Sequence, residues 1–266
     1  MPSHEPDRLV RYDAHDGVAT LTLDSDHNRN ALSTPLMTQF LEHLAVAVAD
    51  ESVRVILLDH EGTVFCSGAD LTETAAAREA GQVPAAMLTE VLAALWESPK
   101  PVVARVGGPA RAGGLGLIAA ADLAVCRTDS TFAFSEVRLG VIPAVISATV
   151  LRRLSPRAAA ELYLTGETFD GYRAAHVGLV TRAVPPSDLD NAIAGYVGAL
   201  VKGAPGALAG AKALLRRRHE TDIRAELAEL ATESAGFFLS EEGREGVAAF
   251  RDRRDPRWVP RVEQGT

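Results

Sequence analysis

One glutamate stands where a carboxylate could move a proton. Glu136 follows an aromatic segment, residues 132–134, and precedes an apolar run, so the pattern predicts partial burial. Burial raises the pKa of a carboxyl group, and a carboxylate that titrates near neutral pH can act as a general acid and base. The alternative is a surface glutamate paired with Arg138, two residues further on. The environment of Glu136 therefore decides between an acid–base group and a solvated ion pair.

Two segments rich in small residues could present backbone N–H groups to a ligand. Residues 65–71 read Phe-Cys-Ser-Gly-Ala-Asp-Leu, and residues 111–117 read Arg-Ala-Gly-Gly-Leu-Gly-Leu. Glycines at a helix start leave N–H groups unpaired at the positive end of the helix dipole. One donor from each segment would be enough to hold an oxygen atom that gains negative charge during a reaction. Taken alone, Gly-Ala-Asp is also ordinary turn chemistry, so a plain turn stays open for the first segment.

The elements that must position these segments alternate between strand and helix in the first half of the chain. Two short strands are expected within residues 11–23, around a turn at residues 15–17. Continuous apolar runs are typical of strands buried on both faces, and they occur at residues 53–58, 102–106 and 123–126. Helical spacing of apolar residues, or a glycine-rich start, predicts helices at residues 36–47, 84–96 and 113–121.

The second half of the chain is mostly helical. Only one further strand is expected, at residues 179–184. Helices are predicted at residues 146–154, 157–164, 189–201, 205–217 and 223–238. This change from alternating strands and helices to mostly helices predicts an α/β core over residues 1–200 and a C-terminal α-helical region over residues 201–266. The apolar helical stretches at residues 225–238 and 247–250 would suit a subunit interface.

Composition narrows the class of protein. The 266 residues carry a formal net charge of −8, which argues against nucleic acid as a partner because phosphate binding needs a basic face. The two cysteines, Cys66 and Cys126, and the scattered histidines match no metal-site spacing. Residues 1–8 contain no apolar signal segment, and no stretch of about 18 apolar residues predicts a membrane span. We therefore expect a cytoplasmic protein that binds neither nucleic acid nor membrane.

The three chemical segments, in this order, resemble the enoyl-CoA hydratase/isomerase (crotonase) superfamily. The family pattern has a Gly-Ala-Asp loop, a glycine-rich helix start that leads to Ala-Asp, and a Glu-x-x-x-Gly segment. These occur here at residues 68–70, 113–122 and 136–140. Further matches lie at residues 28–32, 164–168, 174–180 and 245–250, so the resemblance covers nearly the whole chain. It implies a repeated ββα superhelix with a C-terminal α-helical region, assembled through that region as a homotrimer or homohexamer.

The resemblance also implies roles for individual residues. The N–H groups of Ala69 and Gly113 would hold a thioester oxygen, and Glu136 would be the general acid and base. Asp122 would tie the structure together. Contacts with the CoA or acyl part of the substrate are implied for Arg29, Ala31, Ser67, Gly68, Asp70, Leu71, Gly114 and Gly116. The substrate would be an acyl-CoA thioester, with no metal and no cofactor apart from the CoA that it carries.

Gly116 departs from the family pattern. Many hydratases have a second glutamate at this position, and the two carboxylates together hold the attacking water. One carboxylate is enough to move a proton between two carbons. Residues 144–147 also replace a glycine-rich turn, which would reshape an acyl pocket that we expect residues 88–95 and 142–146 to line in part. We rank enoyl-CoA hydration first, with Δ3,Δ2-enoyl-CoA isomerisation by Glu136 alone, or acyl-CoA binding without catalysis, as alternatives.

Two functions unrelated to acyl-CoA chemistry have partial support in the sequence. The sequence Gly114-x-Gly116-x-x-Ala119 partly matches a dinucleotide-binding fingerprint, but residues 107–112 separate it from the preceding strand, where that fingerprint needs a tight turn. A serine hydrolase based on Ser67 or Ser135 would need a nucleophile elbow, and neither serine lies in Gly-x-Ser-x-Gly. Both alternatives are weaker than an acyl-CoA enzyme.

Overall fold

The computed structural model describes residues 8–70, 72–73, 85–216, 222–254 and 256–257, and all structural statements below concern these residues. Its centre is a six-stranded sheet in the order β1-β2-β3-β4-β6-β9. The strands are β1 (Val10–His15), β2 (Val18–Leu23), β3 (Val55–His60), β4 (Val102–Val106), β6 (Leu123–Arg127) and β9 (Arg182–Val184). β1 and β2 form an antiparallel hairpin, and the other neighbours are parallel. Positive φ angles at Asp16 and Gly17 allow the two-residue turn of that hairpin.

A second, smaller sheet contains three short strands. These are β5 (Ala110–Arg111), β7 (Thr131–Ala133) and β8 (Phe169–Asp170), and an isolated bridge joins Cys66 to Ala110 beside them. β4, β5 and α4 (Gly113–Ala120) follow one another along the chain, and β6 and β7 repeat the strand–strand order before α5 (Ala144–Val150). This is the repeated ββα arrangement that the resemblance implied.

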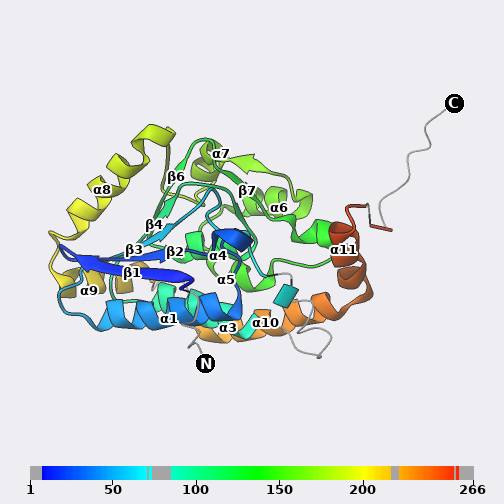
Figure 1. The fold of residues 1–266 in the computed structure, drawn as a ribbon, viewed down its shortest axis with the longest axis horizontal. Helices are drawn as coiled ribbons and strands as arrows, with labels where there is room; N and C mark the ends of the chain where they lie inside the picture. Colours follow the sequence, from blue (N-terminus) through cyan, green and yellow to red (C-terminus); the bar gives the residue numbers. More distant parts are fainter. Residues whose placement is uncertain (1–7, 71, 74–84, 217–221, 255, 258–266) are drawn as a thin grey trace, which may run out of the picture.

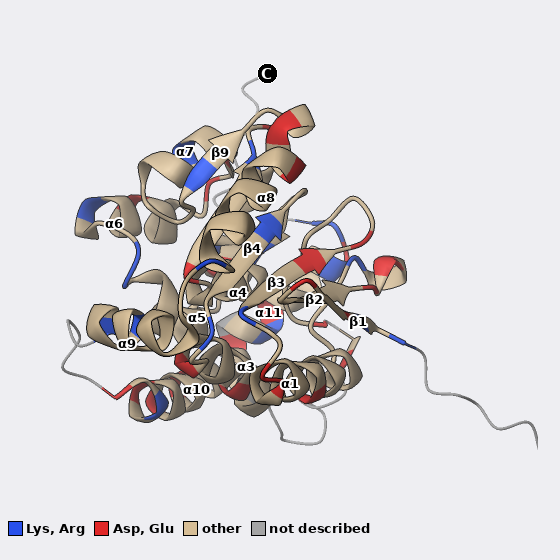
Figure 2. Ribbon diagram, turned by 90° about the vertical axis from the view of Figure 1, so that its left-hand side faces the viewer, with Lys and Arg blue, Asp and Glu red and all other residues tan. Residues whose placement is uncertain are grey.

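Helices cover both faces of the large sheet. α1 (Thr34–Ala49), α3 (Ala85–Glu97) and α10 (Ile223–Leu239) lie on one side, and α8 (Leu189–Leu200) lies on the other (Figures 1 and 2). Alternate residues of the parallel strands therefore enter two different cores. Ile56 and Ala104 belong to the large core, whereas Val55 and Val103 pack in the small core under α8. Burial on both faces explains why these strands read as continuous apolar runs.

The C-terminal helices pack on the core. α9 (Pro205–Arg216) is joined to it by Lys212, whose Nζ lies 2.5 Å from Asp122 Oδ2. Asp122 also accepts a hydrogen bond from the Val102 N–H at 2.8 Å, so it ties α9 to the start of β4, the structural role expected for it. α10 packs against α3 and α5, and α11 (Glu241–Arg251) packs against the 3-10 helix Ser135–Leu139.

Several predicted elements differ from the structure, and three of the differences lie in the second half of the chain. α5 starts at Ala144 and ends at Val150, so it is shifted toward the N-terminus of the predicted residues 146–154, and turns occupy residues 151–153. β9 starts only at Arg182, because residues 177–178 form a turn, with Gly178 at φ +87°, and residues 179–181 are bends. The short helix α7 (Gly171–His176), between α6 (Pro156–Thr165) and β9, was not predicted. Its six residues are too few to show helical periodicity.

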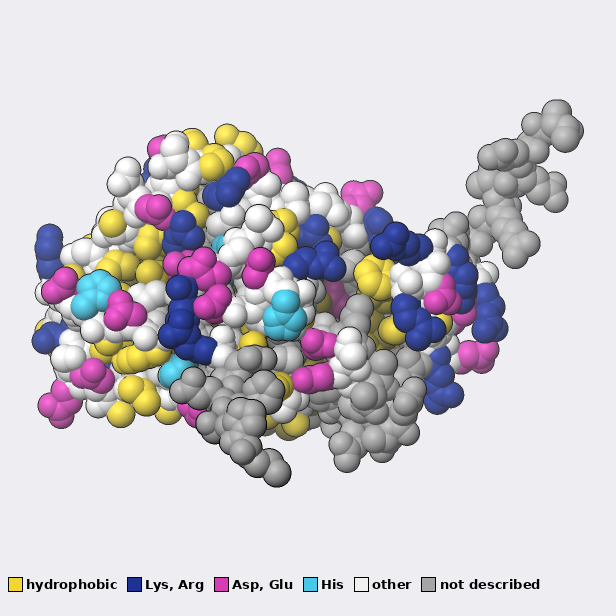
Figure 3. Space-filling view, in the orientation of Figure 1, with side chains coloured by type: hydrophobic (Ala, Val, Ile, Leu, Met, Phe, Trp, Pro, Cys, Tyr) yellow, Lys and Arg dark blue, Asp and Glu magenta, His cyan; other side chains and the backbone are white. Residues whose placement is uncertain are grey.

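The face shown in Figure 3 carries acidic and basic side chains interspersed. No single helix in the described ranges has the length and apolar character needed to cross a membrane. One pair bent by 108°, Pro186–Leu200 with Pro205–Arg216, passes the same length and composition test only when the two helices are taken together.

Candidate active site

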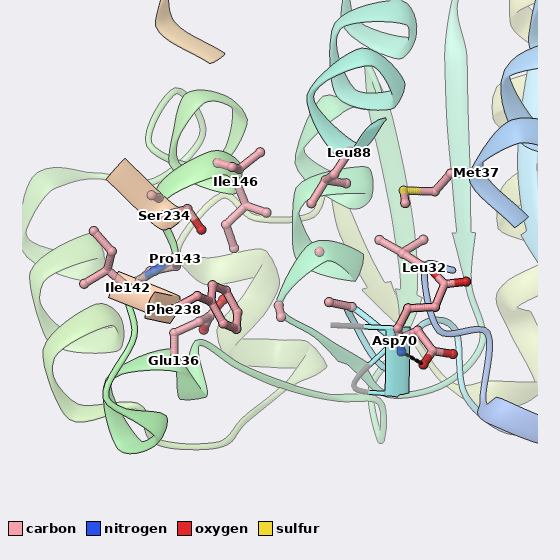
Figure 4. Close-up of a pocket in the computed structure, with 16 residues that line it drawn as sticks. Leu32, Met37, Asp70, Leu88, Glu136, Ile142, Pro143, Ile146, Ser234 and Phe238 are labelled. Carbon is pink, nitrogen blue, oxygen red and sulfur yellow. Dashed lines mark hydrogen bonds between the residues drawn. The ribbon is translucent and has the colours of Figure 1, made fainter. Parts of the chain in front are cut away.

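A cavity with about 740 Å³ of empty space brings the three predicted segments together. Ala69, Gly113 and Glu136 all line it. Most of the remaining wall is apolar, including Leu32, Met37, Leu88, Ile142, Ile146 and Phe238. In Figure 4, Glu136 lies on the same side of the cavity as Ile142 and Phe238, and Leu32 and Met37 lie on the opposite side. A ligand in this cavity would therefore be in contact with apolar walls and a few polar groups.

The first N–H donor belongs to Ala69, in the loop that follows β3. Gly68 adopts φ +95°, and a Cβ at this position would lie 2.8 Å from the Cβ of Ala112, so both the backbone angle and the space require glycine. The Leu32 N–H donates to the Gly68 carbonyl at 2.8 Å and fixes the loop against the residues before α1. Within the described part of the chain, the N–H of Ala69 donates to no acceptor. This N–H is therefore available to a ligand.

The second N–H donor belongs to Gly113, the first residue of α4. A Cβ on Gly113 would lie 2.6 Å from Leu32 Cδ1, so any larger residue would displace the cavity wall. Ala112, just before it, adopts the strained angles φ +45° and ψ −117°. Gly113 is the first residue of the helix, so its N–H has no intrahelical acceptor. Among the described residues this N–H donates to no other acceptor either. The dipole of α4 adds positive potential at this point.

Glu136 is held by the 3-10 helix Ser135–Leu139, which Gly140 ends in the left-handed region at φ +69°. Arg138, the alternative partner of Glu136, points elsewhere. Its guanidinium donates from Nε and Nη2 to the Thr165 carbonyl, at 3.2 and 3.0 Å, and so caps the end of α6. The surface ion pair that the sequence left open is therefore not formed.

The carboxyl group of Glu136 is buried and incompletely bonded. The residue is 8% exposed, and its Oε2 atom has no hydrogen-bond partner among the described residues. Burial raises the pKa of Glu136 to about 7, although a hydrogen bond from its own backbone lowers it in part. Such a group exchanges a proton readily at neutral pH, as a general acid and base must.

The residues expected near the CoA form two adjacent loops. The Ser67 N–H donates to the Arg29 carbonyl at 3.1 Å, and the Ser67 hydroxyl donates to the Asn28 carbonyl at 3.2 Å. Asp70 lines the cavity and accepts from the amide group of Asn28 at 3.2 Å. Arg29 is exposed and Ala31 is buried beside it. The structure thus brings Arg29, Ala31, Ser67, Gly68 and Asp70 together, whereas Leu71 lies outside the described residues.

Gly114 and Gly116 do not line the cavity. A Cβ on Gly114 would lie 2.8 Å from the Cβ of Cys66, so this glycine allows α4 to pack closely on the loop before it. Gly116 is buried against Ile146, whose side chain does line the cavity. Gly114 therefore allows close packing on the loop that carries Cys66, and Gly116 leaves room for the Ile146 side chain.

Several lining residues were not predicted. Ser234 and Phe238 come from α10, about 100 residues after Glu136, and Leu32, Met37 and Glu73 come from segments near α1. Residues 142–146 line the cavity as expected, but within the expected residues 88–95 only Leu88 does so. No local pattern marks Ser234 or Phe238, because a helix that packs on the core shows only its apolar periodicity in the sequence.

The arrangement can bind a carbonyl oxygen and move a proton close to it. Two N–H donors in the cavity lining can stabilise negative charge on that oxygen, and a carboxyl group with a raised pKa lines the same cavity. Within the described residues, no group of three or more His, Cys, Asp or Glu side chains could hold a metal ion.

Comparison with known proteins gives a consistent result. Residues 13–261 match the family model described as enoyl-CoA hydratase/isomerase. The chain is 31% identical to the 2,3-dehydroadipyl-CoA hydratase of Escherichia coli, over 90% of this chain and 94% of that protein. It is 28% identical to the peroxisomal Delta(3,5)-Delta(2,4)-dienoyl-CoA isomerase of Arabidopsis thaliana, over 97% and 99%. A crystal structure of an enoyl-CoA hydratase from Mycobacterium avium superposes with a TM-score of 0.84, at 45% identity, and covers 95% of this chain and 100% of that one.

The fold, the cavity and these matches lead to one assignment. The sheet topology agrees with the ββα superhelix, and the match to the family model extends over most of the chain. The chain belongs to the enoyl-CoA hydratase/isomerase family, the crotonase superfamily.

Proposed function

We propose that this protein is an enoyl-CoA hydratase, which adds water to the conjugated double bond of an acyl-CoA thioester or removes it in the reverse direction. One observation carries the proposal. The N–H groups of Ala69 and Gly113, which donate to no acceptor among the described residues, and the buried carboxyl of Glu136 line a single cavity. The thioester oxygen would accept a hydrogen bond from each N–H, and each donor of this kind lowers the barrier by about 3 kcal/mol.

Glu136 supplies the proton transfers in this scheme. Its carboxylate takes a proton from a water molecule while the water oxygen forms a bond to Cβ of the substrate. The electrons of the double bond move onto the thioester oxygen, which the two N–H groups stabilise as an enolate. The protonated Glu136 then returns a proton to Cα and the thioester carbonyl re-forms. Atoms and charges balance without any metal or redox cofactor.

The acyl part of the substrate would lie against the apolar wall. Ile142, Pro143 and Phe238 lie beside Glu136, and Leu88 and Met37 extend the wall on the other side (Figure 4). The CoA part would leave the cavity past the loops that carry Arg29 and Ser67. An acyl-CoA thioester fits this division into an apolar pocket and a polar entrance.

A Δ3,Δ2-enoyl-CoA isomerase is the second candidate. A specific observation favours it: a Cβ on Gly116 would lie 2.7 Å from Ile146 Cγ2, so hydrocarbon fills the space beside the position where many hydratases carry their second glutamate. With Glu136 acting alone, a proton can still be removed from Cα and returned at the γ carbon. The similarity to a dienoyl-CoA isomerase agrees with this alternative.

The deciding experiment follows the ultraviolet band of the conjugated enoyl thioester. Wild type, Glu136→Gln and Glu167→Gln would each be mixed with crotonyl-CoA, 3-methylglutaconyl-CoA and a 3-enoyl-CoA. Glu167 is exposed and does not line the cavity, so its variant controls for the loss of a carboxylate. If wild type and Glu167→Gln remove the band and Glu136→Gln does not, the result supports hydration. Appearance of the band from the 3-enoyl substrate alone supports isomerisation, and binding without turnover supports a protein that only binds acyl-CoA.

The protein is further proposed to assemble as a homotrimer or homohexamer through its C-terminal helices. Leu214, Leu215 and Phe250 leave large apolar side chains exposed on α9 and α11, as a subunit interface requires. Sedimentation equilibrium of wild type and Leu214→Glu/Leu215→Glu would test this. A wild-type monomer would refute the assembly.

A further inference from the structure

His60, the last residue of β3, joins two chain segments through both nitrogens of its ring. The residue is 7% exposed. Nδ1 lies 3.2 Å from the Glu61 carbonyl oxygen, and Nε2 accepts a hydrogen bond from the Gly107 N–H at 3.0 Å. A carbonyl needs a donor and an N–H needs an acceptor, so these partners fix the neutral tautomer with its proton on Nδ1. Neither nitrogen is left for a further partner.

This contact is the first of a series of contacts between the loop after β3 and the loop after β4. The Phe65 N–H donates to the Pro109 carbonyl at 3.0 Å, and the Arg111 N–H donates to the Cys66 carbonyl at 3.0 Å. The series ends where Gly68 packs against Ala112, one residue before each of the two N–H donors of the cavity. The other contacts in it are made by the backbone, whereas the His60 contact depends on a side chain.

The same histidine is connected to a third loop. The Glu61 carbonyl that faces Nδ1 also accepts a hydrogen bond from the Asn30 amide at 3.0 Å. Asn30 is fully buried, and its amide also donates to the Val64 carbonyl at 2.9 Å. It lies between Arg29 and Ala31, on the loop expected at the CoA entrance. One hydrogen-bonded group therefore connects all three loops around the cavity mouth.

We propose that His60 is a positioning residue for the oxyanion hole, and that its two hydrogen bonds set the register of the loops that present the Ala69 and Gly113 N–H groups. The inference rests on the proposed function of these two donors. Donors are effective only when they are held close to the position of the developing oxyanion, and a displacement of about 1 Å can lower a rate by a hundredfold. His60 touches no substrate and would act only through the loops.

Burial favours the neutral form of His60, although charged groups lie around it. Asp59 accepts a hydrogen bond from the His60 backbone N–H at 2.7 Å, and the Arg105 guanidinium of β4 pairs with Asp59 at 3.2 Å. The Glu61 side chain pairs with Arg11 of β1, and the Phe65 ring packs edge-on against the imidazole. Burial lowers the pKa of His60, with a smaller contribution from Arg105 in the same direction, although Asp59 and the Glu61 carbonyl oppose it. A second proton, on Nε2, would face the Gly107 N–H and break this contact.

Three variants test the inference. His60→Phe keeps a ring against Phe65 but loses both hydrogen bonds. His60→Gln keeps an oxygen that can reach the Gly107 N–H. Ser98→Ala is the matched control, because buried Ser98 also donates to one carbonyl and accepts from one backbone N–H, both of Lys100, at the opposite end of β4. kcat, KM, melting temperature and amide hydrogen exchange of residues 61–70 and 105–116 would be measured for each.

We expect kcat of His60→Phe to fall between about ten- and a hundredfold with little change in KM, and His60→Gln to recover most of it. Ser98→Ala should lose thermal stability without losing kcat. The acid limb of log kcat/KM against pH should steepen from a slope of one to a slope of two in wild type, as His60 becomes protonated after Glu136, and should keep a slope of one in His60→Gln. Unchanged kcat in His60→Phe, or an equal loss in Ser98→Ala, would overturn the inference.

Hydrogen exchange separates failure of the inference from failure of the proposed function. Faster exchange in both loops of His60→Phe, but not of Ser98→Ala, would show that His60 holds the loops whatever reaction they serve. Unchanged exchange in both loops would overturn the contact itself. Absence of turnover by wild type on all acyl-CoA substrates would refute the proposed function, and the positioning role in catalysis with it.

Discussion

The Cγ2 methyl of Ile146 lies 2.7 Å from the position that a Cβ on Gly116 would occupy. Leu92 Cδ2 would be 3.3 Å from the same point, and the Thr149 hydroxyl donates to the Gly116 carbonyl at 3.2 Å. α4 and α5 therefore pack so closely that position 116 admits no side chain. The difference from hydratases with two glutamates is not a single substitution, because the neighbouring helix has filled the space.

Gly116→Glu should consequently fail to add a second catalytic carboxylate. It would crowd Ile146 and bury a charge, and we expect it to lower the free energy of unfolding by more than about 3 kcal/mol. Gly116→Ala should lower it by about 1–3 kcal/mol. Urea unfolding would measure both. Gly195→Ala in α8 is the matched control, because nothing lies within 4 Å of a Cβ there and a better helix former should stabilise slightly. A stable Gly116→Glu protein with faster hydration would contradict this view of the site.

Glu136→Gln should be more stable than wild type above neutral pH. A pKa of about 7 in the folded protein means that folded Glu136 holds its proton more tightly than unfolded Glu136 does. Stability therefore falls as the pH rises from the ordinary glutamate pKa to about 7, by about 3 kcal/mol in total. Glutamine removes this dependence. In urea unfolding, the free energies of unfolding of the two proteins should be close at pH 5, and that of the variant should be higher at pH 8. Parallel stability curves would show that Glu136 is not buried as described.

The Gly113 N–H can be removed without adding a side chain. Substitution by proline would also crowd Leu32, because even a Cβ at Gly113 would lie 2.6 Å from it. Replacement of the Gly113 amide by a backbone ester, through semisynthesis, removes only the hydrogen-bond donor. We expect kcat to fall by about a hundredfold or more with KM little changed. The same replacement at Gly206, an exposed residue in the first turn of α9, is the control. Full activity of the Gly113 ester would rule out this donor.

Phe238 closes the cavity from α10 and should limit the acyl chain. Phe238→Ala would open space beside Ile142 and Glu136, so activity should shift toward longer or branched acyl groups (Figure 4). The ratio of kcat/KM for a C8 and a C4 enoyl-CoA would measure the shift, which we expect to reach about tenfold in favour of the longer chain. Phe237→Ala is the matched control, since Phe237 is partly exposed and does not line the cavity. An equal shift in both variants would indicate a general loosening of α10.

The three segments that line the candidate active site could be predicted because each is local. Ala69 and Gly113 lie in short runs of small residues whose backbone geometry is decided by their immediate neighbours, and the strands before them are marked by apolar runs. Glu136 was recognisable by its position after an aromatic segment. The rest of the cavity around it is lined by α5 and α10, which come later in the chain.

Features that depend on tertiary packing could not be predicted. Ser234 and Phe238 reach the cavity because α10 packs on α3 and α5, and nothing in their own segment marks that contact. Gly116 looked like a ligand-binding glycine in sequence, but its partner Ile146 is 30 residues away. The hydrogen bond that His60 Nε2 accepts comes from Gly107, 47 residues later, so the sequence around His60 does not indicate it.

The pair of buried Lys212 and half-buried Asp122 should hold the C-terminal helices on the core. Lys212 is 6% exposed, and its Nζ also donates to the Lys100 carbonyl at 3.0 Å. Asp122→Ala would leave a buried ammonium group without its partner, at a cost of about 3–5 kcal/mol. Lys212→Met leaves Asp122 bonded to the Val102 N–H and should cost much less. The double variant should be more stable than Asp122→Ala alone, because it no longer buries an unpaired charge.

The pH dependence of stability gives an independent test of this pair. Burial lowers the pKa of Lys212 to about 8, although Asp122 raises it in part. The unfolded chain therefore holds more protons than the folded one between about pH 8 and the ordinary lysine pKa, so stability should rise with pH through this range. Lys212→Met should lack this rise, and Asp122→Ala should begin it at a lower pH. Urea unfolding between pH 7 and pH 10 would measure it. An Asp122→Ala protein as stable as wild type at pH 7, with an unchanged pH profile, would show that α9 is held by its apolar contacts alone.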